Sequence, residues 1–176
     1  SVTSPSIGLV GDNSLFGYFG PVNGSRYNLT YSPSVALFDN SLEYHTLTAD
    51  YRRYWDLTSG YTFALRSLNA MSTGRDPQTF RIGGFSTLRG YPDFDLLGSR
   101  VALGNLELRF PFIQQLGLVG PVPIGNFFFR GALFTDFGMV WDDGEPLRFT
   151  KVGLDGKRRL DSPYMSFGTG IRTYLL

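Results

Sequence analysis

Apolar and polar residues alternate with a period of two along most of this chain. Successive side chains of an extended strand point to opposite faces, so the alternation predicts strands with one apolar and one polar face. It predicts seven strands, at about residues 7–19, 25–37, 42–55, 60–71, 99–111, 126–142 and 163–175. Two long polar loops, 72–98 and 143–162, lie between the later strands. We therefore expect an all-β, antiparallel fold.

The last three predicted strands show the two faces most clearly. Their polar face carries Glu107, Arg109, Arg130, Asp136 and Arg172, and their apolar face carries Leu106, Leu108, Phe129, Phe137 and Phe167. The apolar face is the richer of the two. In a soluble β-sandwich or lipocalin-like barrel the outward face is polar, whereas a membrane barrel turns its apolar face to lipid and its polar face to the lumen.

Strand length also favours a membrane barrel over a soluble fold. Several predicted strands exceed the usual soluble length of about 5–6 residues, and they fit the roughly 9–11 tilted residues that cross a bilayer. Aromatic side chains gather near the strand ends, as in the aromatic girdles of membrane barrels; they are Tyr54, Trp55, Phe127, Phe128, Phe129, Trp141 and Tyr174. We predict a transmembrane β-barrel, with a soluble β-fold as the alternative.

Composition and charge exclude several classes of function. The formal net charge of +1 is spread along the chain, so no basic patch for nucleic acid is predicted. There is no cysteine, which excludes disulfides and thiolate metal sites. No nucleophile elbow or phosphate-binding glycine loop is present, so we expect neither an enzyme nor a cofactor. The acidic group at 142–145 is interpreted as a solvated turn rather than a calcium site.

The first long loop contains the most informative segment, 83–91, with the sequence GGFSTLRGY. Its glycine pair permits a tight fold and close packing. Arg89 follows an apolar leucine, which suggests that this part of the loop is buried. A buried guanidinium needs carboxylate partners, and the next two strands offer Glu107 and Asp136.

Four segments of the chain, 83–91, 105–111, 134–141 and 166–172, resemble in order and spacing the BamA-type outer-membrane barrel superfamily. This group includes bacterial surface antigens, barrel-assembly and translocation-assembly proteins, two-partner secretion transporters and chloroplast import channels. The resemblance covers about residues 80–175. It implies an antiparallel transmembrane barrel with a lid loop folded into the lumen.

The resemblance also implies roles for individual residues. The lid-loop motif corresponds to Gly83, Gly84, Arg89, Gly90 and Tyr91. Its arginine would reach into the lumen and pair with the inner-wall carboxylates of Glu107 and Asp136. By strand alternation, Arg109, Arg130 and Arg172 are further lumen-facing charges.

The expected function follows from that family. We expect a protein of the bacterial outer membrane that assembles or inserts barrel proteins, or moves polypeptide or lipid across the membrane. Its partners would be the lipid bilayer and either nascent barrel proteins or another chain at an open strand edge. The alternatives are a small barrel that anchors, or forms a pore for, an upstream soluble domain, and a soluble β-structured binding module. We expect residues 1–176 to be one barrel domain, incomplete at its C-terminal side and without its upstream periplasmic domains.

Overall fold

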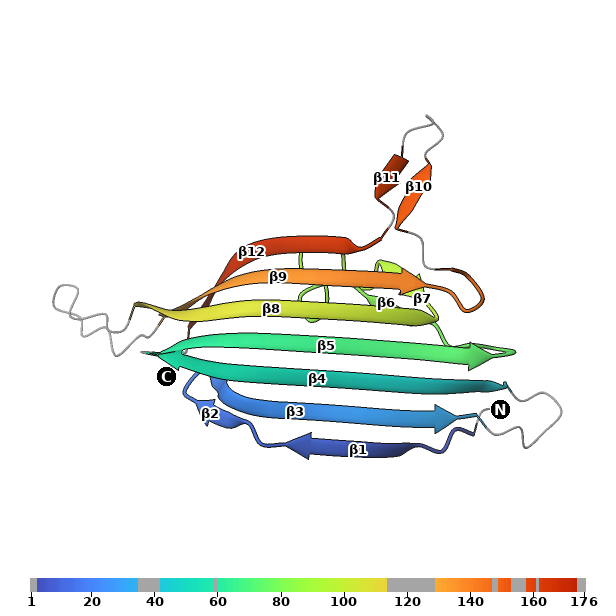
Figure 1. Ribbon diagram of the computed structural model, residues 1–176, viewed down its shortest axis with the longest axis horizontal. Coiled ribbons are helices and arrows are strands. Elements are labelled where there is room, and N and C mark those ends of the chain that lie inside the picture. Colours follow the sequence, from blue (N-terminus) through green and yellow to red (C-terminus); the bar gives the residue numbers. More distant parts are fainter. Residues whose placement is uncertain are drawn as a thin grey trace.

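One antiparallel sheet dominates the computed structural model, which describes residues 3–34, 42–58, 60–113, 129–146, 149–152, 158–160 and 162–173 (Figure 1). In spatial order its strands are β1 (Ile7–Asp12), β3 (Gly20–Pro33), β4 (Tyr44–Thr58), β5 (Tyr61–Gly74), β8 (Arg100–Ile113), β9 (Phe129–Trp141) and β12 (Tyr164–Thr173), and β2 (Leu15–Gly17) also pairs with β3. The predicted antiparallel all-β class is confirmed. Among the described residues, no helix is long and apolar enough to cross a membrane.

The first predicted strand is interrupted, and the structure divides it into β1 and β2. At the break, the Asn13 side-chain oxygen accepts hydrogen bonds from the Ser25 amide (2.6 Å) and hydroxyl (3.0 Å). Gly24 has a φ of 97°, and a Cβ there would lie 2.3 Å from the Asn13 carbonyl oxygen. Only glycine allows this close approach, so a local bend replaces the continuous strand that alternation predicts.

The two long loops, expected to be irregular, each contain a short hairpin. The first holds β6 (Phe80–Ile82) and β7 (Leu96–Gly98), and the second holds β10 (Thr150–Val152) and β11 (Arg158–Leu160). The β6–β7 hairpin lies against β8 and β9, whereas β10–β11 projects beyond the main sheet (Figure 1). Strands of three residues carry too little alternation to be recognised in sequence.

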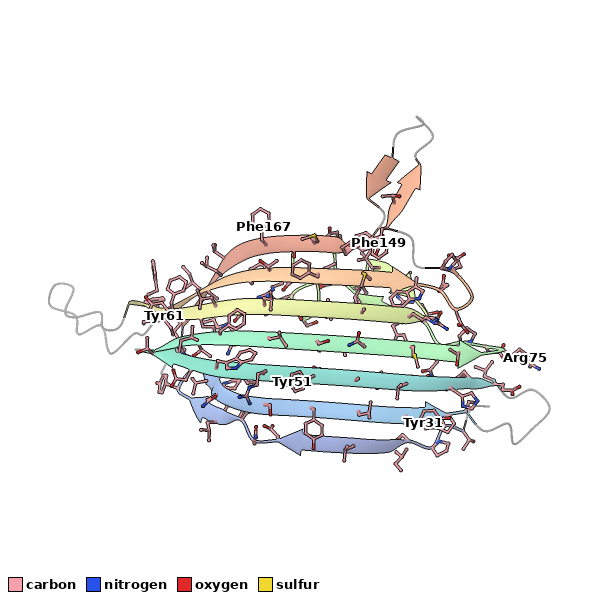
Figure 2. The ribbon with its side chains drawn as sticks, viewed as in Figure 1. Tyr31, Tyr51, Tyr61, Arg75, Phe149 and Phe167 are labelled. Carbon is pink, nitrogen blue, oxygen red and sulfur yellow. The ribbon has the colours of Figure 1, made fainter. Side chains whose placement is uncertain are left out.

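The two faces of the sheet follow the predicted alternation. Cross-strand partners share a face: Glu107 lies opposite Ala64 and Phe134, while Leu106 lies opposite Leu65 and Thr135. Asp136 is fully buried on the first of these faces, here called the inner face. On the outer face Phe167 is 89% exposed and projects away from β12 (Figure 2). On β8, β9 and β12, Glu107 and Asp136 thus lie on the inner face, whereas Leu106 and Phe167 lie on the outer face.

The aromatic girdle differs in one place from the expectation. Tyr54 is buried on the inner face, where the Arg109 guanidinium lies 5.7 Å from its ring centroid. It shares its parity with Asp50 and Arg52, so it must face the lumen. Trp55 is on the outer face, 5.6 Å from the Phe63 ring. Residues 127, 128 and 174 lie outside the described residues.

A small hydrophobic core fills the space between the first loop and the inner face. Ile82, Ala70 and Val101 form its centre, and Leu88 is fully buried beside them. A Cβ on Gly138 of β9 would lie 3.2 Å from both Ile82 and Leu88, so this glycine provides the room for the loop. The loop is thus packed against β5, β8 and β9.

The described sheet does not close into a barrel. Its edges are β1, paired only with β3, and β12, paired only with β9. This agrees with the expectation that the described strands form part of a barrel wall. The curved wall has an inner face that carries the first long loop and an outer face that carries the apolar side chains.

Candidate functional site: a loop bonded to the inner wall

The lid loop, defined here as residues 83–91, is shaped by its glycines. Gly83 and Gly84 have φ values of 129° and 81°, and a Cβ on Gly83 would lie 2.2 Å from the Pro92 carbonyl oxygen. The loop closes through the Gly84 amide, which donates to the Tyr91 carbonyl (3.1 Å). Thr87 fixes its interior, since its hydroxyl donates to the Gly83 carbonyl (2.7 Å) and accepts from the Gly83 amide (2.8 Å). The resulting turn points Arg89 at the sheet.

The Arg89 guanidinium lies between two inner-wall carboxylates. Its Nε and Nη2 donate to the two oxygens of Asp136 (2.8 and 2.7 Å), and its Nη1 donates to Glu107 Oε2 (2.8 Å). The Arg89 amide adds a bond to Asp136 Oδ2 (3.1 Å). The three side chains are 14%, 0% and 9% exposed for Arg89, Asp136 and Glu107. A planar, five-donor group suits this arrangement, because a point-like ammonium cannot pair with both acids in the same way.

Phe134 is a further partner of Arg89 that the charge pattern does not reveal. The guanidinium carbon lies 3.6 Å from the Phe134 ring centroid, a cation–π contact in a partly dry site. On β12, a Cβ at Gly168 would come within 2.6 Å of the same ring. The missing side chain of Gly168 therefore lets Phe134 lie along the inner wall beneath Arg89. The sequence signal that could have identified Phe134 is strand alternation, which places it on the same face as Asp136.

Besides the Asp136 contact on β9, other polar contacts attach the lid loop to three more strands. Asn105 of β8 donates to the Thr87 carbonyl (2.7 Å) and to Asp136 Oδ1 (2.8 Å). Arg66 of β5 donates to the Ser86 carbonyl (2.9 Å). The Tyr91 hydroxyl donates to the Met165 carbonyl of β12 (3.3 Å). Gly90, with a φ of 86°, turns the chain beside Ser166.

The remaining predicted lumen charges divide into two groups. Arg109 and Arg172 both donate to Glu107 Oε1, at 2.7 and 2.9 Å, so they belong to the Arg89 network. Arg109 also reaches the Pro21 carbonyl of β3 (3.1 Å). Arg130 points elsewhere: it bonds to the Gly60 carbonyl, its Nη2 lies 3.4 Å from the Thr62 hydroxyl, and its guanidinium carbon is 5.8 Å from the Phe19 ring centroid.

A second ion cluster lies beside the lid loop. Arg52 and Arg66 each donate twice to Asp50, at 3.2 and 2.8 Å for Arg52 and at 3.2 and 2.9 Å for Arg66. Asp50 thus bridges its neighbour Arg52 on β4 and Arg66 on β5. Arg53 lies on the outer face, 5.6 Å from the Trp55 ring centroid.

This site consists of a permanently charged guanidinium, that of Arg89, held by carboxylates. Burial alone would lower the pKa of the Arg89 guanidinium, but its hydrogen bonds to the Asp136 and Glu107 carboxylates raise that pKa above its usual value. The guanidinium therefore stays charged at every physiological pH. The arrangement holds a loop in place by charge-assisted hydrogen bonds.

The acidic group after β9 has structural partners. Asp142 accepts a hydrogen bond from the Ser99 amide (3.0 Å), and Asp143 pairs with Arg100. No cluster of three or more His, Cys, Asp or Glu that could hold a metal ion occurs among the residues that the structure describes.

The long antiparallel strands, the apolar outer face and the charged inner face that carries a bonded loop define a membrane β-barrel wall. A family model described as the Omp85 superfamily domain matches residues 4–175, and the chain belongs to that superfamily. No curated protein sequence matches the chain.

A similar solved structure is "The crystal structure of BamA from Haemophilus ducreyi lacking POTRA domains 1-3". The two folds agree with a TM-score of 0.64 at 18% sequence identity, over 97% of this chain and 42% of that one. The chain thus spans less than half the length of the BamA chain. The predicted membership of the BamA-type barrel superfamily is confirmed.

Proposed function

We propose that this chain is the lipid-embedded wall of a bacterial outer-membrane protein that inserts or translocates other polypeptides. The observation that carries the proposal is the lid loop, which four strands of an Omp85-type wall hold against its inner face. The protein would do this work without catalysing a reaction on its client, because the Arg89 site binds a loop through fixed charges.

The outer face suits a lipid environment. Phe167 and Ile171 of β12 are exposed on it, as is Leu133 of β9. Leaving such side chains in water is unfavourable, whereas a bilayer accommodates them. A soluble β-structured module, the second alternative from the sequence, would have to cover this face.

Client strands would engage the protein by main-chain pairing. The exposed edge of a sheet presents unpaired N–H and C=O groups to which an extended segment can add. β1 and β12 are the edges of the described sheet. Pairing at either edge would let the wall serve as a template while the lid loop keeps its inner face rigid.

Reconstitution into liposomes tests the proposal. Purified full-length protein should accelerate the folding of a urea-unfolded outer-membrane barrel protein added from outside, measured by its heat-modifiable migration on gels. Arg89→Ala should reduce the acceleration, while Arg53→Ala, on the outer face, should not. Conductance without acceleration would instead support the anchor or pore, and extraction without detergent would contradict membrane residence.

A further inference from the structure

A cavity of about 150 Å³ lies on the inner face beside the lid loop. Five arginines line it, namely Arg52, Arg66, Arg89, Arg109 and Arg172, together with a single acid, Glu107. Liquid water occupies about 30 Å³ per molecule, so the cavity has room for a small hydrated anion. This combination of volume and lining is not explained by the attachment of the lid loop alone.

The charge around the cavity is not balanced. The five guanidinium groups bond to three carboxylates, those of Asp50, Glu107 and Asp136, so five positive and three negative charges leave a net +2. Asp50 and Asp136 approach the arginines from outside the cavity lining. The cavity itself is therefore strongly positive.

The strand register places like charges opposite one another. Arg26, Arg52 and Arg66 are successive cross-strand partners on β3, β4 and β5. Arg130 and Arg172 are partners on β9 and β12. Directly opposed like charges destabilise a sheet. Asp50 offsets this repulsion between Arg52 and Arg66, and an anion beside Arg172 would offset it there.

Among the contacts within the described residues, Arg172 uses the fewest of its donors. There it makes one hydrogen bond, from Nη2 to Glu107 Oε1, and it shares that oxygen with Arg109. Its side chain is 42% exposed, so its other N–H groups can reach a ligand. Planar guanidinium groups match phosphate and carboxylate oxygens in pairs.

We propose that this cavity is an oxyanion-binding site that takes a phosphate or carboxylate group. Arg172 and Arg109 bind it from the sheet, and Arg89 binds it from the lid loop. Phe85, an exposed side chain of the lid loop, borders the cavity and offers a contact for an apolar part of a larger ligand. The site does not depend on client insertion, so either proposal can fail without the other.

Titration calorimetry on the full-length protein in detergent tests the site, with sodium phosphate and sodium acetate as separate probes at constant ionic strength. The expected result is saturable binding of at least one probe. Arg172→Gln should weaken it about tenfold, the scale of one lost charge-assisted hydrogen bond. Arg53→Gln is the matched control on the outer face and should bind normally. Preference for phosphate points to a phosphate-bearing ligand, and preference for acetate to acidic groups of a polypeptide.

Three results would overturn the proposal: no saturable heat with either probe at millimolar concentration, equal weakening by Arg53→Gln, or unchanged binding by a folded Arg172→Gln. Heat-modifiable migration checks the fold of each variant. If Arg172→Gln does not fold, Arg172→Lys replaces it. Because Arg172→Lys keeps the charge but loses the planar fork, it should still weaken binding measurably, and unchanged affinity would again count against the site.

Discussion

Replacing Arg89 by alanine removes the central group of the lid-loop site. Three side-chain hydrogen bonds to carboxylates disappear, together with the contact to the Phe134 ring. Glu107 keeps Arg109 and Arg172, so its charge stays paired. The loss falls mainly on Asp136, which is fully buried and, among the described residues, retains the hydrogen bonds from Asn105 and from the amide of residue 89.

The expected magnitude follows from that uneven loss. Removing one partner of a buried ion pair typically costs about 3–5 kcal/mol, because the remaining charge has no compensation. Asp136 keeps two hydrogen bonds and the Arg89 side chain is 14% exposed, so we expect the lower end, about 3 kcal/mol. Arg89→Lys should recover only part of this, since an ammonium cannot span both acids.

Urea unfolding in lipid vesicles, followed by heat-modifiable migration, measures the change in the free energy of unfolding. Arg53→Ala is the control for removing an arginine that has no carboxylate partner in the described structure. The double variant Arg89→Ala/Asp136→Asn should be more stable than Arg89→Ala, because asparagine carries no charge to leave buried. Equal midpoints for Arg89→Ala and Arg53→Ala would refute the reasoning, as would purely additive effects in the double variant.

Three further changes probe the same architecture. Gly84→Ala places a Cβ about 1.5 Å from an Asp93 carboxylate oxygen at a φ of 81°, so the lid loop should become protease-sensitive, as limited proteolysis would reveal; resistance equal to wild type would contradict this. Gly138→Val fills the space under Leu88 and should lower the free energy of unfolding in urea by about 1–3 kcal/mol. Gly144→Ala is the control, because a Cβ there meets nothing within 4 Å and the change tests only the positive φ. The lid loop of Gly144→Ala should stay protected from protease. Phe167→Arg puts a charge on the lipid face and should cost about 2–4 kcal/mol if the residue lies near the bilayer midplane; unchanged vesicle folding would mean that this face does not meet lipid.

Strand positions and faces were accessible from sequence because they depend on local alternation. For example, the alternation of Leu106 and Glu107 with their immediate neighbours is enough to place them on opposite faces. Partners across strands are harder, because they depend on register and on where each side chain lies along the barrel axis. Arg130 and Arg172 share a face and oppose each other directly, yet one reaches Gly60 and the other Glu107. The alternation of apolar and polar residues cannot predict these different partners.

The lid-loop site was accessible in part for a similar reason. A buried arginine calls for carboxylates, and charge pairing is a rule that sequence can apply. Phe134 and Asn105 contribute through ring stacking and amide hydrogen bonds, for which many other residues in the chain have equal chemical capacity. The break at Asn13 was also hidden, because it depends on Gly24 in the neighbouring strand approaching its backbone. Tertiary proximity decides such details.

The sequence separations within the lid-loop site have a consequence for the order of folding. Arg89 pairs with residues 18 and 47 positions later, and Tyr91 bonds to a residue 74 positions later. Each bond must wait until the strand that supplies its acceptor has joined the sheet, and distant pairings form late. A partly built wall therefore carries an uncompensated arginine on a free loop, whereas a wall with β8, β9 and β12 in register retracts it. Whether the lid loop is free or bonded to the inner face therefore depends on how many of these strands have joined the sheet.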